Sequence, residues 1–225
     1  MLQGKWGKLA FLMCLSMLAS QEVTAQSSPQ SSFYAGVEIG HANLSFKPHY
    51  RFVNGAPDVT FDNQADGSMG GILAGYHWKS GKDYSLDLEG LLSASNASWQ
   101  MALPEPASFR YDVPMNLSVS LLPSFHLTDK FAVFAQAGLA LGRIRERKSA
   151  VSTSMYDVNE WRPGIVAGFG MRLTLDDRWS MRIGYRRTRY QNHEFATYLA
   201  NGSQVEAVTS RVEQSATTLS LVKEF

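Results

Sequence analysis

The sequence has almost no cysteine and, beyond its first residues, no long apolar run. Its 225 residues include one cysteine, Cys14, which excludes a disulfide scaffold within the chain. A run of about 18 apolar residues, the length that a spanning helix needs, does not occur after residue 25. The five histidines are scattered without metal-ligand spacing, and phosphate-binding and dinucleotide-binding motifs are missing. The sequence therefore predicts no metal and no cofactor.

An excess of charge of one sign is also missing. The whole chain carries 21 basic and 20 acidic residues. Lys5, Lys8 and Glu22 lie in the first 25 residues, so 19 of the 21 basic and 19 of the 20 acidic residues remain after them. A balanced charge gives no reason to expect a nucleic-acid partner.

The N-terminal residues have the pattern of a secretory signal peptide. Lys5 and Lys8 precede an apolar run from Leu9 to Ala19, and small residues follow near Ala25. This run is too short to span a membrane as a helix. We therefore predict a cleaved signal peptide over 1–25, a short disordered N-terminus over 26–32 and one domain over 33–225.

From residue 33 onward, apolar and polar residues alternate in repeated segments, as in half-buried strands. Eight such segments are present: Phe33–Phe46, Ser68–Trp78, Tyr84–Ala97, Met115–Leu127, Phe131–Arg145, Trp161–Leu173, Trp179–Tyr190 and Glu213–Phe225. The connections between them alternate long and short, including a long loop at 47–67 and another at 191–210. This sorting is typical of a membrane barrel with short periplasmic turns and long extracellular loops. We predict an all-β, eight-stranded, antiparallel, up-and-down transmembrane β-barrel.

Aromatic residues gather at both ends of these segments, as expected for two membrane interfaces. The set beside the short turns is Tyr76, Trp78, Tyr84, Phe125, Phe131, Trp179 and Phe225. The set beside the long loops is Trp99, Tyr111, Trp161 and Tyr190. We therefore expect two aromatic girdles on the outer surface.

Several of these segments resemble the small eight-stranded outer-membrane barrels of Gram-negative bacteria, the OmpA/OmpX-like group. The resemblance lies in FYAGVEIGHANL, GGILAGYHW, FAVFAQAGLALG, WSMRIGYRRTRY and the terminal Phe225. It implies a location in the outer membrane, among outer-membrane lipids. It also implies that the assembly machinery reads the last strand through Leu219, Leu221 and Phe225, although Lys223 departs from the apolar pattern. No peptidoglycan-binding domain is expected after the barrel.

Charged residues occur at positions whose parity points into the barrel. They are Glu38, Asp87, Glu89, Arg162, Arg172, Arg182 and Arg186. The lumen of an eight-stranded barrel is just wide enough to be filled by side chains. We therefore predict an ion-pair network that plugs the lumen, with a narrow ion path and catalytic carboxylates as the alternatives.

A second group of arginines has the opposite, outward parity at the long-loop end. It consists of Arg143, Arg145, Arg147, Arg187, Arg189 and Arg211, on segments expected to be neighbours. Guanidinium groups bind phosphate in a bidentate manner. The hypothesis is that these side chains contact lipopolysaccharide phosphates, and the alternative is an ordinary solvated rim.

Some small barrels are lipid deacylases that use a serine and a histidine on the outer surface. The nearest such pair here, Ser124 and His126, has inward parity and lies by a short turn, and His193 has no strand-fixed serine beside it. We therefore predict a structural or interaction protein, adhesin-like or supporting envelope integrity, that acts through its extracellular loops. The alternatives are a narrow low-conductance channel and, less favoured, a lipid A-modifying enzyme. The sequence names no ligand for the loops.

Overall fold

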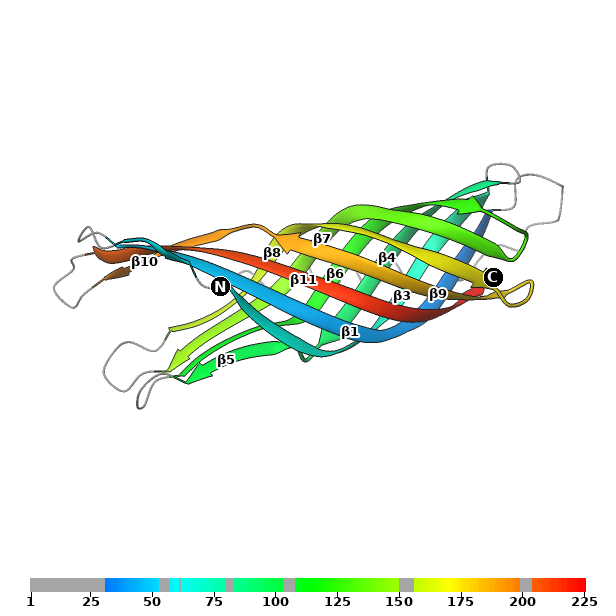
Figure 1. The fold of residues 1–225 in the computed structure, drawn as a ribbon. Coiled ribbons are helices and arrows are strands. Elements are labelled where there is room, and N and C mark those ends of the chain that lie inside the picture. Colours follow the sequence, from blue (N-terminus) through cyan, green and yellow to red (C-terminus); the bar gives the residue numbers. More distant parts are fainter. Residues whose placement is uncertain are drawn as a thin grey trace, which may run out of the picture.

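The computed structural model describes residues 31–52, 57–60, 62–79, 83–102, 108–149, 156–198 and 204–225. They form one antiparallel sheet that closes on itself into a barrel (Figure 1). The strands are β1 (Ser31–Phe52), β2 (Val59–Thr60), β3 (Asn63–Lys79), β4 (Tyr84–Ser95), β5 (Ser98–Ala102), β6 (Ser108–His126), β7 (Phe131–Ser149), β8 (Tyr156–Thr174), β9 (Trp179–Tyr190), β10 (His193–Tyr198) and β11 (Gln204–Glu224). Eight of them, β1, β3, β4, β6, β7, β8, β9 and β11, make the closed wall, and the short β2, β5 and β10 extend it. The predicted eight-stranded up-and-down barrel is confirmed.

The register of the strands fixes the shape of this barrel. A walk around the wall through paired residues leaves β1 at Phe33 and returns to β1 at Asn43, ten residues further along the strand. A stagger of this size corresponds to strands tilted by about 40° from the barrel axis. Because a strand rises about 3.3 Å per residue, each residue adds about 2.5 Å of height along the axis.

The short connections form compact turns at one end of the barrel. The Asp176 carboxylate accepts hydrogen bonds of 2.8 Å from the backbone N–H groups of Arg178 and Trp179. The Thr128 hydroxyl oxygen accepts one of 3.1 Å from the backbone N–H of Phe131. These side chains replace ladder partners where the chain reverses, which is the ordinary use of Asp and Thr in turns.

Most strands extend further at the other end than the alternation predicted. β1 continues through part of the expected loop 47–67 to Phe52, and β11 begins at Gln204 rather than at Glu213. β10 lies wholly within the expected loop 191–210. Residues 31 and 32 belong to β1, so the predicted disordered N-terminus is wrong for those two. The remainder of that segment and the predicted signal peptide lie outside the described residues.

Above the membrane-spanning part, the wall divides into two projections (Figure 1). The pairing of β3 with β4 ends at Met69 and Ser95, and the pairing of β8 with β9 ends at Gly164 and Tyr190. Beyond these points β10, β11 and β1 continue as one projection, and β5 to β8 as the other. The described residues of the long connections are therefore largely strand.

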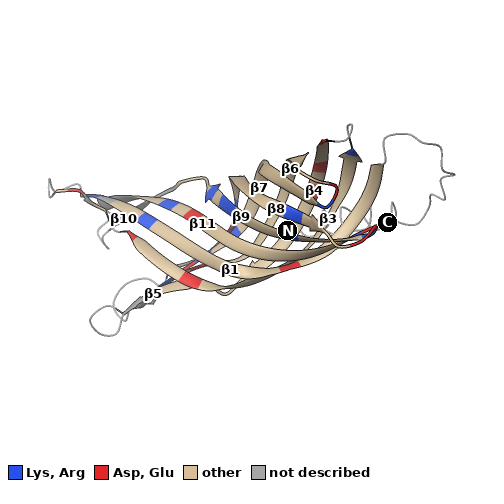
Figure 2. Cartoon of the chain, turned by 45° about the vertical axis from the view of Figure 1, so that its right-hand side comes forward, with Lys and Arg blue, Asp and Glu red and all other residues tan. Residues whose placement is uncertain are grey.

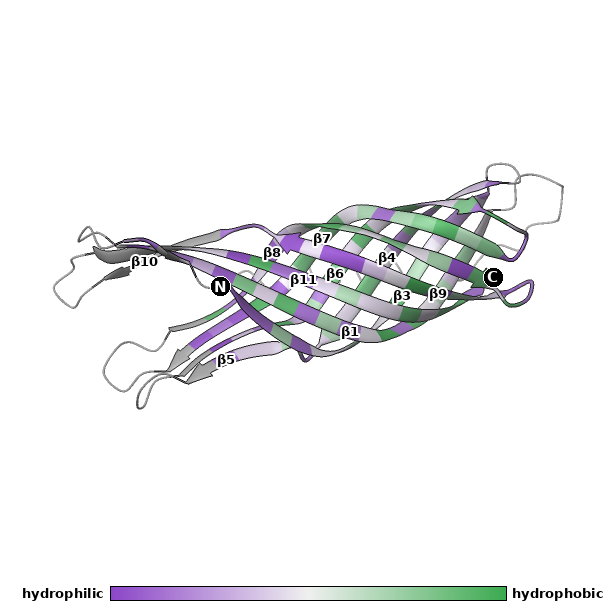
Figure 3. Cartoon of the chain, in the orientation of Figure 1, coloured by the Kyte–Doolittle hydropathy of each residue, from purple (hydrophilic) through white to green (hydrophobic). Residues whose placement is uncertain are grey.

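The outer surface of the barrel is an apolar band, seen as green patches in Figure 3. Leu139, Ile39 and Phe169 are 70%, 66% and 64% exposed on this surface. Such exposure suits hydrocarbon and would be unusual in water. The described residues contain no helix that is long and apolar enough to cross a membrane.

The inner wall carries glycine where large rings lie against it. A Cβ atom built on Gly75 would meet the ring of Tyr34, and one on Gly142 would meet the ring of Tyr190. These two glycines let the large side chains lie flat against the inner surface of nearby strands: Tyr34 lies over Gly75 on the adjacent strand β3, and Tyr190 reaches past β8 to Gly142 on β7.

Candidate functional sites in the lumen and on the outer surface

The periplasmic half of the lumen is organised around Asp87 on β4. This carboxylate is fully buried, and its Oδ1 lies 2.5 Å from Nδ1 of His77 on β3. Its Oδ2 accepts hydrogen bonds from the guanidinium of Arg172 on β8 and, at 3.4 Å, from that of Arg182 on β9. One acid thus joins four strands, and both of its oxygens accept charge-assisted hydrogen bonds or lie beside the imidazole of His77.

A second acid continues the network one step higher. Glu89 accepts hydrogen bonds of 2.6 Å from Arg182 and 3.0 Å from the Tyr34 hydroxyl. The guanidinium carbon of Arg182 lies 4.7 Å from the centre of the Tyr34 ring, a distance typical of a cation–π contact. Above this, Arg186 binds Glu38 in a bidentate manner at 2.5 and 2.8 Å. All three acids of the predicted set are therefore paired inside the barrel.

Arg162 is the one predicted luminal residue that does not join these pairs. It lies on β8, ten residues from Arg172 towards the extracellular end, and its Nε donates to Glu160 instead. The alternation predicted its inward direction correctly. Its partner was missed because Glu160 lay just outside the expected strand, which began at Trp161.

Two further members of the network, Tyr34 and His77, were also missed. Both stand at inward positions of the expected strands, Tyr34 beside Glu89 and His77 beside Asp87. Inward parity alone could have identified them. Neither residue carries a formal charge at neutral pH, which is the property that defines the predicted set.

A small cavity separates the two upper ion pairs. Its volume is about 30 Å³, and it is lined by side chains that include Glu38, Glu89, Gln136, Arg182 and Arg186. A space of this size holds one or two water molecules. The periplasmic half is therefore polar and contains room for single waters.

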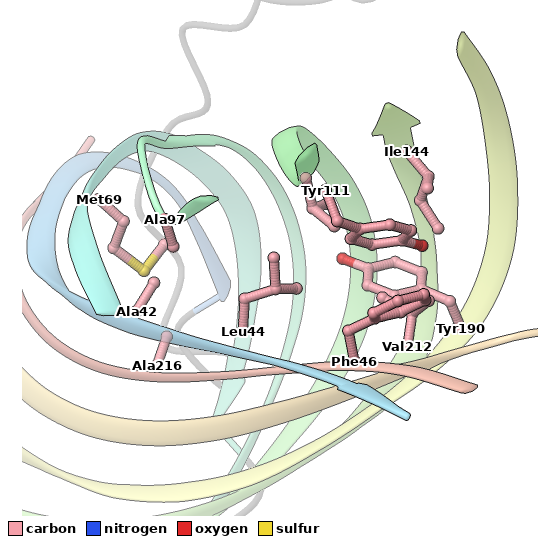
Figure 4. Close-up of a cluster of buried hydrophobic side chains, with 11 residues drawn as sticks. Ala42, Leu44, Phe46, Met69, Ala97, Tyr111, Ile144, Tyr190, Val212 and Ala216 are labelled. Carbon is pink, nitrogen blue, oxygen red and sulfur yellow. The ribbon is translucent and has the colours of Figure 1, made fainter. Parts of the chain in front are cut away.

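The extracellular half of the lumen is filled by apolar side chains instead. The cluster consists of Ala42, Leu44, Phe46, Met69, Ala97, Tyr111, Val113, Ile144, Tyr190, Val212 and Ala216, all buried (Figure 4). The rings of Phe46 and Tyr111 stack with their centres 4.2 Å apart. We call this cluster the apolar plug.

The apolar plug corrects the expected upper girdle. Tyr111 and Tyr190 are 0% and 1% exposed and point into the lumen, not towards lipid. Trp99 packs against the plug. Trp161 does lie on the outer surface, 51% exposed. The girdle beside the short turns is present, with Phe33, Tyr76 and Trp78 in edge contact at 4.8 and 4.6 Å.

The histidine near the short turn has a different partner from the one that its position in the chain suggested. Nε2 of His126 lies 2.9 Å from the Ser85 hydroxyl, whereas the Ser124 hydroxyl is directed to the backbone oxygen of Leu122. Both serines face the lumen, so this pair is not exposed to the outer leaflet. No group of three potential metal-ligating side chains occurs in the part of the chain that the structure describes.

The six outward arginines form two groups and not one. Arg143, Arg145 and Arg147 are on β7, whereas Arg187 and Arg189 are on β9, and β8 lies between them. The expectation that these strands are neighbours is therefore wrong. Arg211 is on β11 beside β9, so it belongs to the second group. Figure 2 shows basic residues of the chain in blue along the strands.

Each group includes a polar partner on an adjacent strand. Nε of Arg143 donates to Asn159 on β8 at 2.8 Å. Glu213 on β11 pairs closely with Arg187 and more loosely with Arg189, at 3.9 Å. Arg187 and Arg189 nevertheless keep exposed side chains, at 61% and 48%. Their guanidinium groups can therefore reach further anions.

The residues expected to carry the assembly signal face outward on β11 and at Phe225, which directly follows it. Leu219 and Leu221 are each 42% exposed, and Phe225 is 73% exposed. The ammonium group of Lys223, which departs from the pattern, lies 5.6 and 5.4 Å from the rings of Trp179 and Phe225. This position at the membrane edge lets the charge remain near water while its stem covers apolar surface.

The comparisons with known proteins agree with this architecture. Residues 9–214 match the family model described as outer membrane protein beta-barrel domain. The outer membrane protease OmpT from Escherichia coli is 10% identical, with a TM-score of 0.50 over 92% of this chain and 100% of that chain. Neisserial surface protein A (NspA) is 15% identical, with a TM-score of 0.49 over 87% of this chain and 99% of that chain.

Ail of Yersinia pestis, solved in complex with the heparin analogue sucrose octasulfate, is 10% identical, with a TM-score of 0.37 over 83% of this chain and 98% of that chain. No curated protein matches the chain. At 10% identity, the likeness to OmpT shows the fold alone. The family match covers most of the chain, so this protein belongs to the outer membrane protein beta-barrel domain family and resides in the outer membrane of Gram-negative bacteria.

Proposed function

We propose that this protein is a structural and interaction protein of the outer membrane, with a plugged lumen and with its contacts made by its outer and extracellular surfaces. The observation that carries this proposal is the filling of the lumen in two tiers. Ion pairs cross its periplasmic half, and the apolar plug fills its extracellular half. A small barrel filled in this way offers no wide aqueous path.

The alternative is a narrow channel, and the polar periplasmic half with its small cavity is the feature that favours it. A conductance measurement distinguishes the two functions. The mature protein is reconstituted in a planar bilayer, with a porin in a parallel bilayer as the positive control. We expect no steady conductance, because the apolar plug excludes hydrated ions. Steady steps of porin size would contradict the plugged lumen, and small regular steps would favour the channel.

The second part of the proposal is that the outward arginines bind lipopolysaccharide phosphates. The two arginine groups stand on the outer surface near the extracellular edge of the apolar band, where a charge costs little. Phosphate accepts bidentate hydrogen bonds from guanidinium groups, which are present here in excess over the nearby Glu213. An interaction protein of this kind would be anchored among the sugars and phosphates that surround its extracellular projections.

Lipid analysis of purified protein tests this contact. Replacement of Arg143, Arg145, Arg187 and Arg189 by glutamine should lower the amount of co-purifying lipopolysaccharide. The matched control replaces Lys79, Lys130 and Arg178, exposed cations at the periplasmic end, by glutamine and should leave that amount unchanged. Equal lipopolysaccharide content in the wild type and the arginine variant would remove this part of the proposal.

The protein is also proposed to lack lipid-modifying activity. The serine–histidine pair that the structure brings together, Ser85 and His126, faces the lumen at the periplasmic end. A lipid acyl chain in the outer leaflet does not reach that position. Incubation with lipopolysaccharide, followed by mass spectrometry of its lipid part, should show unchanged acylation.

A further inference from the structure

We infer that the barrel thins the outer leaflet on one side, where phosphorylated glycolipid headgroups descend about 10 Å against the outer face of β9, β11, β1 and β3. The inference extends the proposed lipopolysaccharide contact from the rim into the depth of the membrane. It rests on the uneven height of the apolar band. We call the outer face of these four strands the short side and that of β6, β7 and β8 the long side.

On the long side, six or seven successive outward positions counted from the short turns are apolar. The sets are Phe125, Pro123, Leu121, Val119, Leu117 and Met115 on β6; Phe131, Val133, Ala135, Ala137, Leu139 and Leu141 on β7; and Leu173, Met171, Phe169, Ala167, Ile165, Pro163 and Trp161 on β8. Two residues make one step, which adds about 5 Å of height. The long side therefore spans about 25–30 Å, the thickness of a hydrocarbon core.

On the short side the band covers only the first four outward positions of each strand, and on β11 one of these four is Lys223. The last apolar residues are Tyr185 on β9, Leu219 on β11, Ile39 on β1 and Ile72 on β3. The outward residues above them are Arg187, Arg189, Thr217, Ser215, Glu213, His41, Asn43, Gly70, Ser68 and Asp66. The lower edges of the two sides are level, because both start at the aromatic residues beside the short turns. The difference in height of about 10 Å therefore falls in the outer leaflet.

The polar residues of the short side are arranged for a wet surface. Nε2 of His41 on β1 lies 3.1 Å from Oδ1 of Asp66 on β3, and the two side chains are 64% and 65% exposed. Asn43 donates to the same carboxylate at 2.9 Å. Beside them, Arg187 pairs with Glu213 while most of its side chain stays exposed. Lipid-facing charges are costly deep in hydrocarbon and nearly free at the interface, whereas local thinning of a bilayer costs little per ångström.

Lipid headgroups fit this surface better than a second protein does. The polar residues extend over four of the eight wall strands, which is half of a convex circumference. A neighbouring barrel would touch only a strand or two of such a surface. Headgroups are small and follow its curvature. A phosphorylated glycolipid supplies phosphates for Arg187 and Arg189 and sugar hydroxyls for neighbours such as Thr217 and Asn43.

Spin labels at two matched positions test the inference directly. Cys14 lies in the predicted signal peptide, so a single cysteine can be placed in the mature chain. Thr217 on the short side and Ala167 on the long side are both exposed, and each lies six residues above the outward residue near the lower edge of its strand, Lys223 and Leu173. Thr217→Cys and Ala167→Cys are labelled and placed in nanodiscs that contain lipopolysaccharide.

The collision rates of each label with oxygen and with a water-soluble nickel complex then report its depth. We expect the label at position 217 to collide several-fold more often with the nickel complex, and the label at position 167 with oxygen. Equal, oxygen-dominated collision rates at both positions would overturn the inference. The heat-dependent gel shift of a folded barrel confirms that both variants are folded.

A second variant links the thinning to the polar residues themselves. Replacement of Arg187, Ser215 and His41 by leucine should extend the apolar band of the short side and move the label at position 217 into the oxygen-accessible region. An unchanged label would overturn the assignment to these residues. This readout is independent of lipopolysaccharide retention in the arginine-to-glutamine variant, so the inference and the proposed function can fail separately.

Discussion

The two halves of the lumen close the same barrel by opposite means. The periplasmic half is crossed by charged side chains, each acid meeting one or two arginines. The extracellular half is filled by rings and aliphatic side chains. A buried ion pair is stable only while both partners are present, whereas an apolar cluster is stable only while its volume is filled. The two halves should therefore respond to different kinds of substitution.

The largest effect is expected from the loss of one charge in the periplasmic half. Asp87→Asn leaves Arg172 and His77 without their carboxylate and should lower the free energy of unfolding by about 3–5 kcal/mol. The measurement is urea unfolding followed by tryptophan fluorescence. Asp66→Asn, which removes an exposed carboxylate, serves as the control and should change the stability little. A similar change in both variants would contradict a buried network centred on Asp87.

The next largest effect is expected from a change of volume in the apolar plug. Leu44→Ala should cost about 2–5 kcal/mol, because it removes buried carbon atoms and leaves a cavity. Ile144→Val removes one methyl group from the same cluster and should cost about 1 kcal/mol. The same urea titration measures both. Equal costs, or none, would mean that the plug is loosely packed and that the contrast with the ion-pair half is weaker than the geometry indicates.

A smaller effect is expected from substitution of Gly142, which makes room for the Tyr190 ring of the apolar plug. A methyl group on Gly142 would meet the Tyr190 ring, so Gly142→Ala should cost about 1–3 kcal/mol. Gly90 faces outward, and the nearest atom to its added Cβ is 3.8 Å away. Gly90→Ala should therefore be neutral or slightly stabilising. If the two variants unfolded at the same urea concentration, the ring would not be held against Gly142.

The alternation of residues was enough to predict the barrel and the direction of each luminal charge. It could not predict which arginine meets which acid, since Arg182 and Glu89 come together only through the ten-residue stagger of the closed sheet. It also underestimated the strands outside the membrane. There, both faces of β1 and β11 are mostly polar or mixed, so the two-residue period loses its contrast.

The sequence of β1 contains a signal for the apolar plug. On β1 the outward apolar set ends at Ile39, and the apolar residues then move to the opposite parity at Ala42, Leu44 and Phe46. A change of phase within one strand marks the height at which the outer face turns polar and the inner face turns apolar. The plug and the short side of the outer band are thus two aspects of one sequence feature.

The pairing of β1 with β11 has a kinetic consequence. The other neighbours in the eight-stranded wall are consecutive hairpins, whereas this seam joins residues as distant as Ser32 and Glu224, which are 192 positions apart. Bringing together residues so distant in sequence costs loop-closure entropy before the hydrogen bonds between the two strands can form. We therefore expect the seam to form last, with the hairpins already aligned. Until the seam forms, β1 and β11 each have an unpaired edge, and the chain therefore needs protection from aggregation.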